Sequence, residues 1–257
     1  MPETDDAELL LAVVREAGAL ALARAGAPGL VRDKPDGGGP VSEADLEVDA
    51  LLRQRLLAAR PDYGWLSEET EDGAARLRAA RVFIVDPIDG TRAFLAGQPT
   101  WAISAAIAAA GEVVVGVVHM PALGKTYAAR AGAGATRNGR PMAPSGRDAL
   151  DGAEVLANAN QMLPEFWPGG VPAVQRHFRP SIAYRLCLVA EGRFDATLTF
   201  RPSWEWDVAA GDLIARESGT AVSDRDGRPL VYNRPDPRVA GIIAAPPALH
   251  AALLARR

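Results

Sequence analysis

A strand that runs directly into a pair of carboxylates constrains the fold more than any other feature of the sequence. Residues 81–85 read Arg-Val-Phe-Ile-Val, a short β-prone run that ends abruptly at Asp86 and Pro87. Gly90 then permits a tight turn, and Thr91 begins a short helical stretch. We therefore predict a buried strand whose end carries acidic side chains and turns at once into a helix.

The two carboxylates of this segment, Asp86 and Asp89, are only three residues apart. Locked by Pro87, they can converge on one point and hold a cation, while the first amides of the following helix can bind an anion. A cation site beside an anion site is suited to phosphoryl chemistry. The alternative is an Asx-turn that caps the helix, which is the commoner meaning of such a motif in isolation.

Three further acidic segments belong to the same argument. Glu68 and Glu69 follow a short apolar run, so a strand end is favoured over a solvated helix face. Asp207 opens an apolar helix and, taken alone, is an ordinary N-cap. Asp45 follows Ser42 by three residues and, taken alone, belongs to the first turn of a helix.

The remaining pattern predicts an α/β chain with helices and strands in both halves. The expected helices cover residues 5–25, 43–60, 182–190, 207–217 and 247–255. The expected strands cover residues 63–66, 154–157, 196–200 and 239–244, with an antiparallel meander over 101–129. Residues 138–151 mix Gly, Pro, Arg and Ser and are the candidate domain boundary, and residues 27–40 are expected to be a mobile loop.

Composition restricts the possible ligands. The chain has 257 residues with 28 basic and 32 acidic side chains, a formal charge of -4, so a nucleic-acid polymer is not an expected partner. Cys187 is the only cysteine and there are three histidines, which excludes an intramolecular disulfide and leaves oxygen atoms as the expected metal ligands. We find no signal-peptide pattern and no apolar run long enough for a membrane span, and we expect a cytoplasmic protein.

Taken together, the four acidic segments resemble the inositol monophosphatase superfamily of magnesium-dependent, lithium-sensitive phosphatases. The resemblance runs from about Lys34 to Gly219, and residues 86–91 and 206–211 reproduce the two signatures of that family almost letter for letter. It implies a layered αβαβα fold, a site between an N-terminal α+β part (1–145) and a C-terminal α/β part (146–257), and a homodimer.

The resemblance also implies roles for individual residues. Oxygen atoms would bind two or three Mg²⁺ ions, with Glu68, Asp86 and the carbonyl of Ile88 on one ion and Asp86, Asp89 and Asp207 on a second. Thr91 would pair with Asp45 to orient and deprotonate the attacking water, and the amides of Gly90 and Thr91 would receive the phosphate. Glu68 would thus belong to the catalytic group with Asp45 and Thr91. We also expect Lys34 to reach the site from the loop of residues 33–40, which would close over a third metal position.

The substrate, a small phosphorylated metabolite, has to be inferred from the rim of the site. Inositol monophosphatases carry a glutamate where Phe200 stands here, and Arg201 and Trp204 are better suited to a second phosphate or a base. Arg185 occupies the position of a basic residue in bacterial bisphosphate nucleotidases, although most arginines on helices simply face solvent. We therefore predict a 3'(2'),5'-bisphosphate nucleotidase that converts adenosine 3',5'-bisphosphate to AMP.

Three alternatives remain open at this point. Inositol 1-phosphate is the second candidate substrate and histidinol phosphate the third. In a different functional class, the chain would bind metal or phosphate without turnover, although such a protein would not need Thr91 as a proton relay. A calcium-binding structural module is disfavoured because the acidic residues are scattered and no EF-hand loop occurs.

Overall fold

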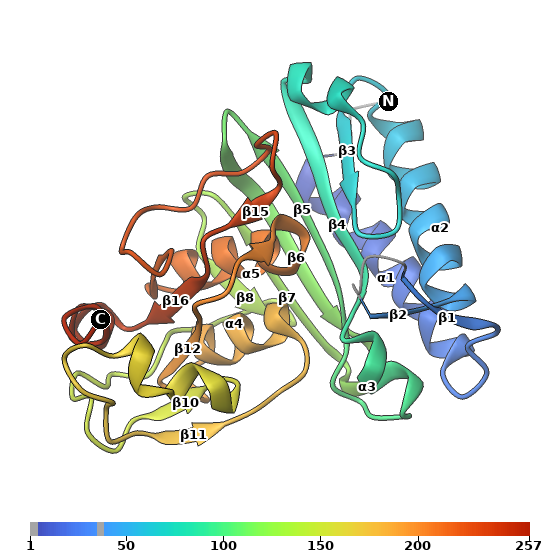
Figure 1. Ribbon diagram of the computed structural model, residues 1–257. Helices are drawn as coiled ribbons and strands as arrows, with labels where there is room; N and C mark the ends of the chain where they lie inside the picture. Colours follow the sequence, from blue (N-terminus) through green and yellow to red (C-terminus); the bar gives the residue numbers. More distant parts are fainter. Residues whose placement is uncertain (1–4, 35–38) are drawn as a thin grey trace.

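The computed structural model describes residues 5–34 and 39–257. Two helices form its outer layer on the N-terminal side: α1 (Asp6–Arg24) and α2 (Glu43–Ala59) (Figure 1). Their buried apolar side chains share one core with the adjacent sheet. Ser42 begins α2, and its backbone N–H donates to Asp45 Oδ2 at 2.8 Å in a capping box. Both helices lie within a residue or two of the predicted ranges.

The second layer is a seven-stranded sheet in the order β3-β4-β5-β6-β7-β8-β9. Its strands are β3 (Gly64–Ser67), β4 (Arg81–Asp89), β5 (Ala102–Ala109), β6 (Glu112–Met120), β7 (Lys125–Arg130), β8 (Ala135–Arg137) and β9 (Arg140–Pro141). β3 and β4 are parallel, and every later pair is antiparallel, as the meander prediction requires. Short 3-10 helices, η1 (Ala74–Arg78) and η2 (Pro121–Leu123), lie in the connections.

Strand β4 is longer than predicted, because it continues through both carboxylates instead of ending at Val85. Its pairing with β5 shifts register between Asp86, which faces Ser104, and Asp89, which faces Ala102. Side chains alternate along a strand, so residues three apart would normally lie on opposite faces. The irregularity around Pro87 adds one residue on β4 and allows the two carboxylates to lie on the same side.

The inner helices and the second sheet complete the molecule. α4 (Ile182–Ala190) and α5 (Glu205–Glu217) lie between the two sheets, and α6 (Pro247–Leu254) covers the outer face of the second sheet (Figure 1). That sheet has the order β11-β10-β12-β16-β14, formed by β10 (Glu154–Leu156), β11 (Gln175–His177), β12 (Ala196–Thr199), β14 (Ala221–Ser223) and β16 (Ile242–Ala245). The succession helix–sheet–helix–sheet–helix is the predicted αβαβα arrangement.

Small elements complete the surroundings of the cleft. They are α3 (Thr91–Leu95), the pair β1 (Val31–Asp33) and β2 (Pro40–Ser42), the pair β13 (Ser203–Trp204) and β15 (Arg238–Val239), η3 (Ala159–Met162) and η4 (Pro164–Phe166). The middle layer packs on both sheets, so both proposed parts of the chain contribute to shared cores. The division at residues 145 and 146 stays a prediction.

One predicted helix start is wrong. α5 begins at Glu205, with Trp204 as its N-cap, so Asp207 is the third helical residue and not the cap. Its Oδ2 accepts the backbone N–H of Trp204 at 3.3 Å, which is the reciprocal half of a capping interaction.

Two expectations concern segments that are only partly described. The loop expected to be mobile includes residues 35–38, which lie outside the described residues, as do residues 1–4 of the N-terminal segment. Within the described ranges, no helix is long and apolar enough to cross a membrane.

Candidate active site

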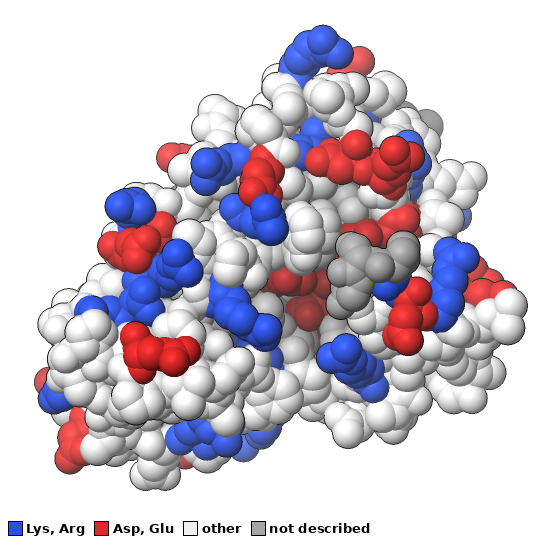
Figure 2. All heavy atoms as spheres, viewed as in Figure 1, with Lys and Arg blue, Asp and Glu red and all other residues white. Residues whose placement is uncertain are grey.

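A cavity of about 940 Å³ lies where β4, α3, α4, β13 and α5 meet. Figure 2 shows it as a hollow with acidic atoms at its bottom and Lys or Arg side chains around its edge. We call Glu68, Asp86, Asp89 and Asp207 the carboxylate floor, and Arg92, Arg185, Arg201 and Arg238 the arginine rim. All eight side chains line the cavity.

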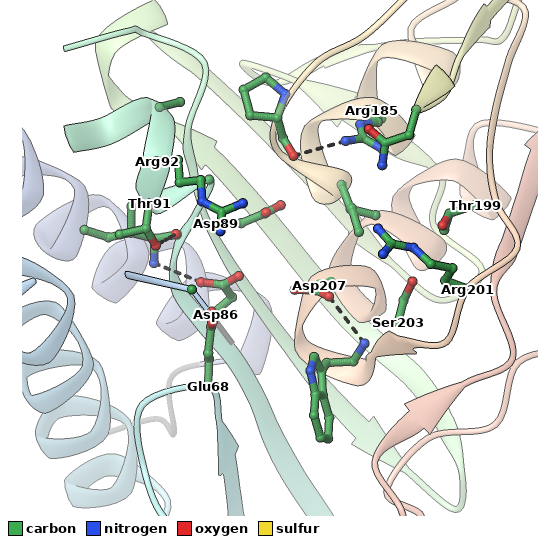
Figure 3. Close-up of a pocket in the computed structure, with 18 of the residues that line it drawn as sticks. Glu68, Asp86, Asp89, Thr91, Arg92, Arg185, Thr199, Arg201, Ser203 and Asp207 are labelled. Atoms are coloured by element: carbon green, nitrogen blue, oxygen red, sulfur yellow. Dashed lines mark hydrogen bonds between the residues drawn. The ribbon is translucent and has the colours of Figure 1, made fainter. Parts of the chain in front are cut away.

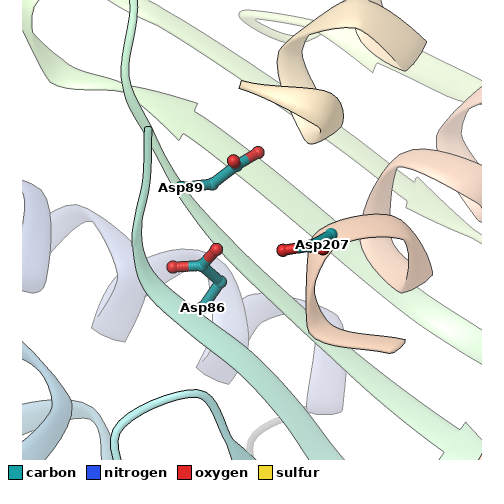
Figure 4. A group of neighbouring side chains, drawn as sticks. All are labelled: Asp86, Asp89 and Asp207. Carbon is teal, nitrogen blue, oxygen red and sulfur yellow. The ribbon is translucent and has the colours of Figure 1, made fainter. Parts of the chain in front are cut away.

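Three floor residues form a compact group. Asp86, Asp89 and Asp207 each offer a carboxylate oxygen, and these oxygens all lie within 4.8 Å of one another. β4 supplies two of them and the first turn of α5 supplies the third, so the group joins the two halves of the chain (Figure 4). It is the one such group of acidic, His or Cys ligands among the described residues.

Hydrogen bonds fix the two β4 carboxylates. Asp86 Oδ1 accepts the backbone N–H of Ile88 at 3.0 Å. Asp89 Oδ2 accepts the hydroxyl of Ser181 at 2.6 Å and the N–H of Ala183 at 2.8 Å, both at the start of α4. Sequence reasoning missed Ser181. Its position before an apolar helix is a recognisable N-cap signal, but nothing in the pattern says that its hydroxyl also donates to Asp89.

Burial and mutual repulsion both disfavour the ionised form of the floor carboxylates. Burial is the main cause that raises the pKa of Asp86 and Asp207 well above the usual value, and neighbouring carboxylates add to it. Burial also raises the pKa of Asp89 to about 6, against the lowering effect of its bonds to Ser181 and Ala183. A divalent cation would offset this repulsion, and an all-oxygen donor set suits Mg²⁺, Ca²⁺ or Mn²⁺. The residues therefore fit a metal of that class.

Glu68 lies at the edge of the compact group, outside the three that share one 4.8 Å cluster. Lys34 Nζ donates to Glu68 Oε1 at 2.7 Å and to Glu69 Oε1 at 2.8 Å, so the lysine reaches the site as expected. Although burial opposes the charge of Lys34, the Glu68 carboxylate raises its pKa above the usual range. Burial raises the pKa of Glu69 to about 7.

Thr91 and Asp45 are in contact. Thr91 Oγ1 lies 3.1 Å from Asp45 Oδ1 and also 3.1 Å from the carbonyl oxygen of Ile88. Asp45 Oδ2 is held by the backbone N–H and hydroxyl of Ser42, at 2.8 and 2.5 Å. Burial raises the pKa of Asp45 in spite of these donors. The carbonyl of Ile88 therefore has a threonine hydroxyl beside it.

The turn between the floor and α3 requires glycine. Gly90 has φ of +100°, and a Cβ there would come within about 3.4 Å of the carbonyl oxygen of Thr100. α3 has only five residues, so its macrodipole is weaker than that of a longer helix. Any attraction of an anion to Gly90 and Thr91 has to come from the local amides.

Arg185 is buried, which contradicts the view that it is simply a solvent-facing helix residue. Its guanidinium donates to the carbonyls of Arg179 and Pro180 at 2.5 and 3.2 Å and lies 4.9 Å from the ring centre of Phe178. Burial lowers its pKa to about 10, while the charge of Asp89 opposes that shift. Arg185 is thus a fixed positive charge in the cavity wall (Figure 3).

Phe200 does not face the cavity. Its buried ring packs on Phe166 and Trp167 in the core beneath α6. Since side chains alternate along an extended segment, its neighbours Thr199 and Arg201 line the cavity instead (Figure 3). Phe200 is therefore a packing residue in this chain.

Trp204 is exposed at the rim, and its indole has two neighbours. Trp206 stacks on it at a centroid distance of 4.7 Å, and the Arg238 guanidinium lies over the ring, 5.5 Å from its centre. Arg238 itself is paired with Asp236 through contacts of 2.8 and 2.9 Å. A planar group that stacks on this indole would compete with these two neighbours for the ring.

Comparison with known proteins gives one family. The chain matches the model of a family described as the inositol monophosphatase family over residues 4–257. It is 38% identical to the inositol-1-monophosphatase of Rhizobium meliloti strain 1021 over 207 residues, 73% of each chain. It is 32% identical to the histidinol-phosphatase of Chlorobaculum parvum over 236 residues, 90% of each chain. It is also 32% identical to the 3'(2'),5'-bisphosphate nucleotidase CysQ of Escherichia coli K12, covering 75% of this chain and 79% of the relative.

The solved structures agree on the fold. An IMPase of Thermotoga maritima superimposes with a TM-score of 0.83 at 28% sequence identity, covering 98% of this chain and 96% of the other.

Proposed function

The chain belongs to the inositol monophosphatase family and is a phosphoric monoester hydrolase, and from this premise we propose that it is a magnesium-dependent 3'(2'),5'-bisphosphate nucleotidase. The substrate would be adenosine 3',5'-bisphosphate, hydrolysed to AMP and phosphate. One observation carries this choice of substrate. Arg92 and Arg201 face the same cavity as the floor, and among the described residues neither side chain has an ion pair or a hydrogen bond. Such arginines are free to bind a second phosphate.

The floor would hold magnesium through Glu68, Asp86, the carbonyl of Ile88, Asp89 and Asp207. Bound there, magnesium would lower the pKa of water, neutralise phosphoryl oxygens and stabilise the leaving oxygen. The remaining steps belong to the chain. Asp45 would accept a proton through Thr91, a role supported by their 3.1 Å contact and by the raised pKa of Asp45. The amides of Gly90 and Thr91 would orient the phosphate.

The arginine rim and Trp204 would bind the parts of the substrate other than the reacting phosphate. Arg185 is pinned by two carbonyls, so we assign it a fixed electrostatic role beside Asp89 and Asp207. Arg201 would contact the second phosphate directly, and Trp204 would border the nucleoside. A mobile arginine and a fixed one together favour a substrate with two anionic groups.

Inositol 1-phosphate is the second candidate, and the 38% identity to the Rhizobium meliloti enzyme favours it. Histidinol phosphate is the third, supported by the Chlorobaculum parvum relative. Its amine is cationic, however, and would face the arginine rim, which disfavours it. We also propose that the protein is a homodimer, which light scattering on the purified enzyme tests.

The deciding experiment compares kcat/KM for adenosine 3',5'-bisphosphate, 3'-AMP, inositol 1-phosphate and histidinol phosphate, with Mg²⁺ and with a chelator. We expect activity only with metal and a preference for the bisphosphate over 3'-AMP, which lacks just the second phosphate. Arg201→Ala should reduce that preference by about 10- to 100-fold, the value of a hydrogen bond to a charged group. Arg228→Ala, a matched change at an exposed arginine outside the cavity, should not alter it. A preference for inositol 1-phosphate, unaffected by Arg201→Ala, would overturn the nucleotidase assignment.

A further inference from the structure

A second carboxylate on α2 has no role in the site described so far. Asp49 lies one helical turn after Asp45, so both side chains lie on the same face of α2. Asp49 is buried, although aspartate is seldom fully buried without partners. The nearer residue, Asp45, contacts Thr91 after the end of β4. Asp49 extends the same face toward the end of β3.

Both oxygens of Asp49 are used at that strand end. Oδ1 accepts the hydroxyl of Ser67, and Oδ2 accepts the hydroxyl of Thr70 at 2.7 Å. Thr70 in turn accepts the indole N–H of Trp65 at 3.3 Å. These two hydroxyl groups bracket Glu68 and Glu69 in the sequence.

The backbone of Glu68 is held from the other side by the sheet. Its N–H donates to the carbonyl of Val85, at 3.2 Å, which continues the parallel pairing of β3 with β4 by one residue. The backbone of Glu68 is therefore held on two sides. On one side it bonds to Val85 of β4, the residue before Asp86, and on the other side the preceding residue, Ser67, bonds to Asp49. The Glu68 side chain is partly exposed and is held at its carboxylate by Lys34, so the backbone anchor and the lysine together set its position.

We propose that Asp49 is a positioning residue that sets the place of Glu68 through Ser67 and Thr70, so that α2 aligns two of the three segments that carry the floor, the third being the start of α5 with Asp207. Asp45 fixes the segment after β4, and Asp49 fixes the segment after β3. This inference rests on the proposed function, because it takes Glu68 to be a metal ligand. Groups that orient metal ligands typically change metal affinity by about 10- to 100-fold when removed.

The test measures Mg²⁺ affinity by calorimetric titration of the purified protein, and melting temperature without metal. Asp49→Asn should weaken Mg²⁺ binding by about 10-fold or more. Glu47→Gln is the matched control, because Glu47 lies on the same helix but its side chain is 40% exposed, and within the described ranges its one ion pair is with Arg24. It should leave Mg²⁺ affinity unchanged.

Further variants separate positioning from a merely structural role. Ser67→Ala removes the hydroxyl that donates to Asp49 and accepts the backbone N–H of Glu69, while leaving Asp49 in place, and it serves if Asp49→Asn does not fold. The double variant should weaken Mg²⁺ binding by less than the product of the two single effects, since both changes act on the contact between Asp49 and Ser67. A lower melting temperature with unchanged Mg²⁺ affinity in both single variants would overturn the proposal.

Glu68→Gln distinguishes failure of this inference from failure of the proposed function. If Glu68→Gln weakens Mg²⁺ binding and neither Asp49→Asn nor Ser67→Ala does so, the positioning role of Asp49 is wrong. If Glu68→Gln itself leaves Mg²⁺ affinity unchanged, the assignment of Glu68 as a ligand is wrong, and the inference falls with it.

Discussion

The carboxylate floor and two arginines of the rim face the same cavity but are built in opposite ways. Asp86 and Asp89 are buried and each accepts hydrogen bonds from the chain, and their positions follow from a strand irregularity and a helix start. On the rim, Arg92 and Arg201 are exposed and unpaired among the described residues. A rigid floor suits chemistry that is shared by a family, and an adjustable rim suits a substrate that differs between its members.

The largest expected effect is the loss of turnover when a carboxylate of the floor is replaced. Asp89→Asn removes one ligand charge but keeps the shape of the side chain, so the fold should survive. We expect kcat to fall by more than the roughly 100-fold typical of residues that only orient a ligand. Steady-state kinetics at saturating Mg²⁺ and circular dichroism measure the two quantities.

Asp148→Asn provides the matched control, because the same chemical change is made at an exposed position outside the cavity. It should leave kcat unchanged. A folded Asp89→Asn protein with near-native turnover would show that Asp89 is not an essential metal ligand and would remove the proposed distinction between floor and rim.

The contrast between floor and rim also explains what the sequence could predict. The order of helices and strands followed from apolar periodicity, and α4 was predicted at its observed bounds. The grouping of Asp86 and Asp89 was expected from the sequence. In a regular strand, however, the two side chains would lie on opposite faces of the sheet. The register shift that brings them to the same face depends on the pairing of β4 with β5. Long-range pairing of that kind leaves no local signal.

Other differences have equally specific causes. Asp207 was interpreted as the N-cap of α5 because aspartate is common at N-cap positions. In the structure, Trp204 occupies the N-cap position, at the end of the strand β13 that pairs with β15. The sequence does not indicate that Arg185 is buried. The carbonyls of Arg179 and Pro180 that accept its hydrogen bonds lie in an irregular segment, whose conformation has no local sequence pattern. Arg238 lies over the Trp204 ring although the two residues are 34 positions apart in the sequence. This contact depends on the pairing of β13 with β15.

A second prediction concerns the effect of pH on the floor. The pKa of Asp89 is raised to about 6, and its ordinary value is 3.8, so the folded metal-free protein holds more protons than the unfolded chain between these values. Stability of the metal-free protein should therefore fall as pH rises through this window. Glu69, with its pKa raised to about 7, extends the fall toward neutral pH.

Magnesium should reverse this trend, because it binds the ionised carboxylates and releases their protons. At a concentration of about 100 Kd it should add roughly 2.7 kcal/mol near pH 8, or about 5–10 °C in melting temperature. The gain should nearly vanish near pH 5. Differential scanning calorimetry with and without Mg²⁺ measures both curves. An equal gain at pH 5 and pH 8 would show that these carboxylates do not hold the metal.

The smallest expected effect lies on the rim, at Trp204. Because Trp206 stacks on this indole and the Arg238 guanidinium lies over it, a nucleobase should gain only edge contacts or a contact with the guanidinium. Trp204→Phe should then raise KM for adenosine 3',5'-bisphosphate by about 2- to 5-fold, the scale of an exposed cation–π contact. The KM for inositol 1-phosphate, which has no aromatic group, is the internal control and should not change. An increase well above 10-fold for the nucleotide alone would mean that the base displaces Arg238 and stacks on the indole, since direct stacking contributes about 1–3 kcal/mol. In that case the rim rearranges on binding, and its contrast with the rigid floor becomes sharper.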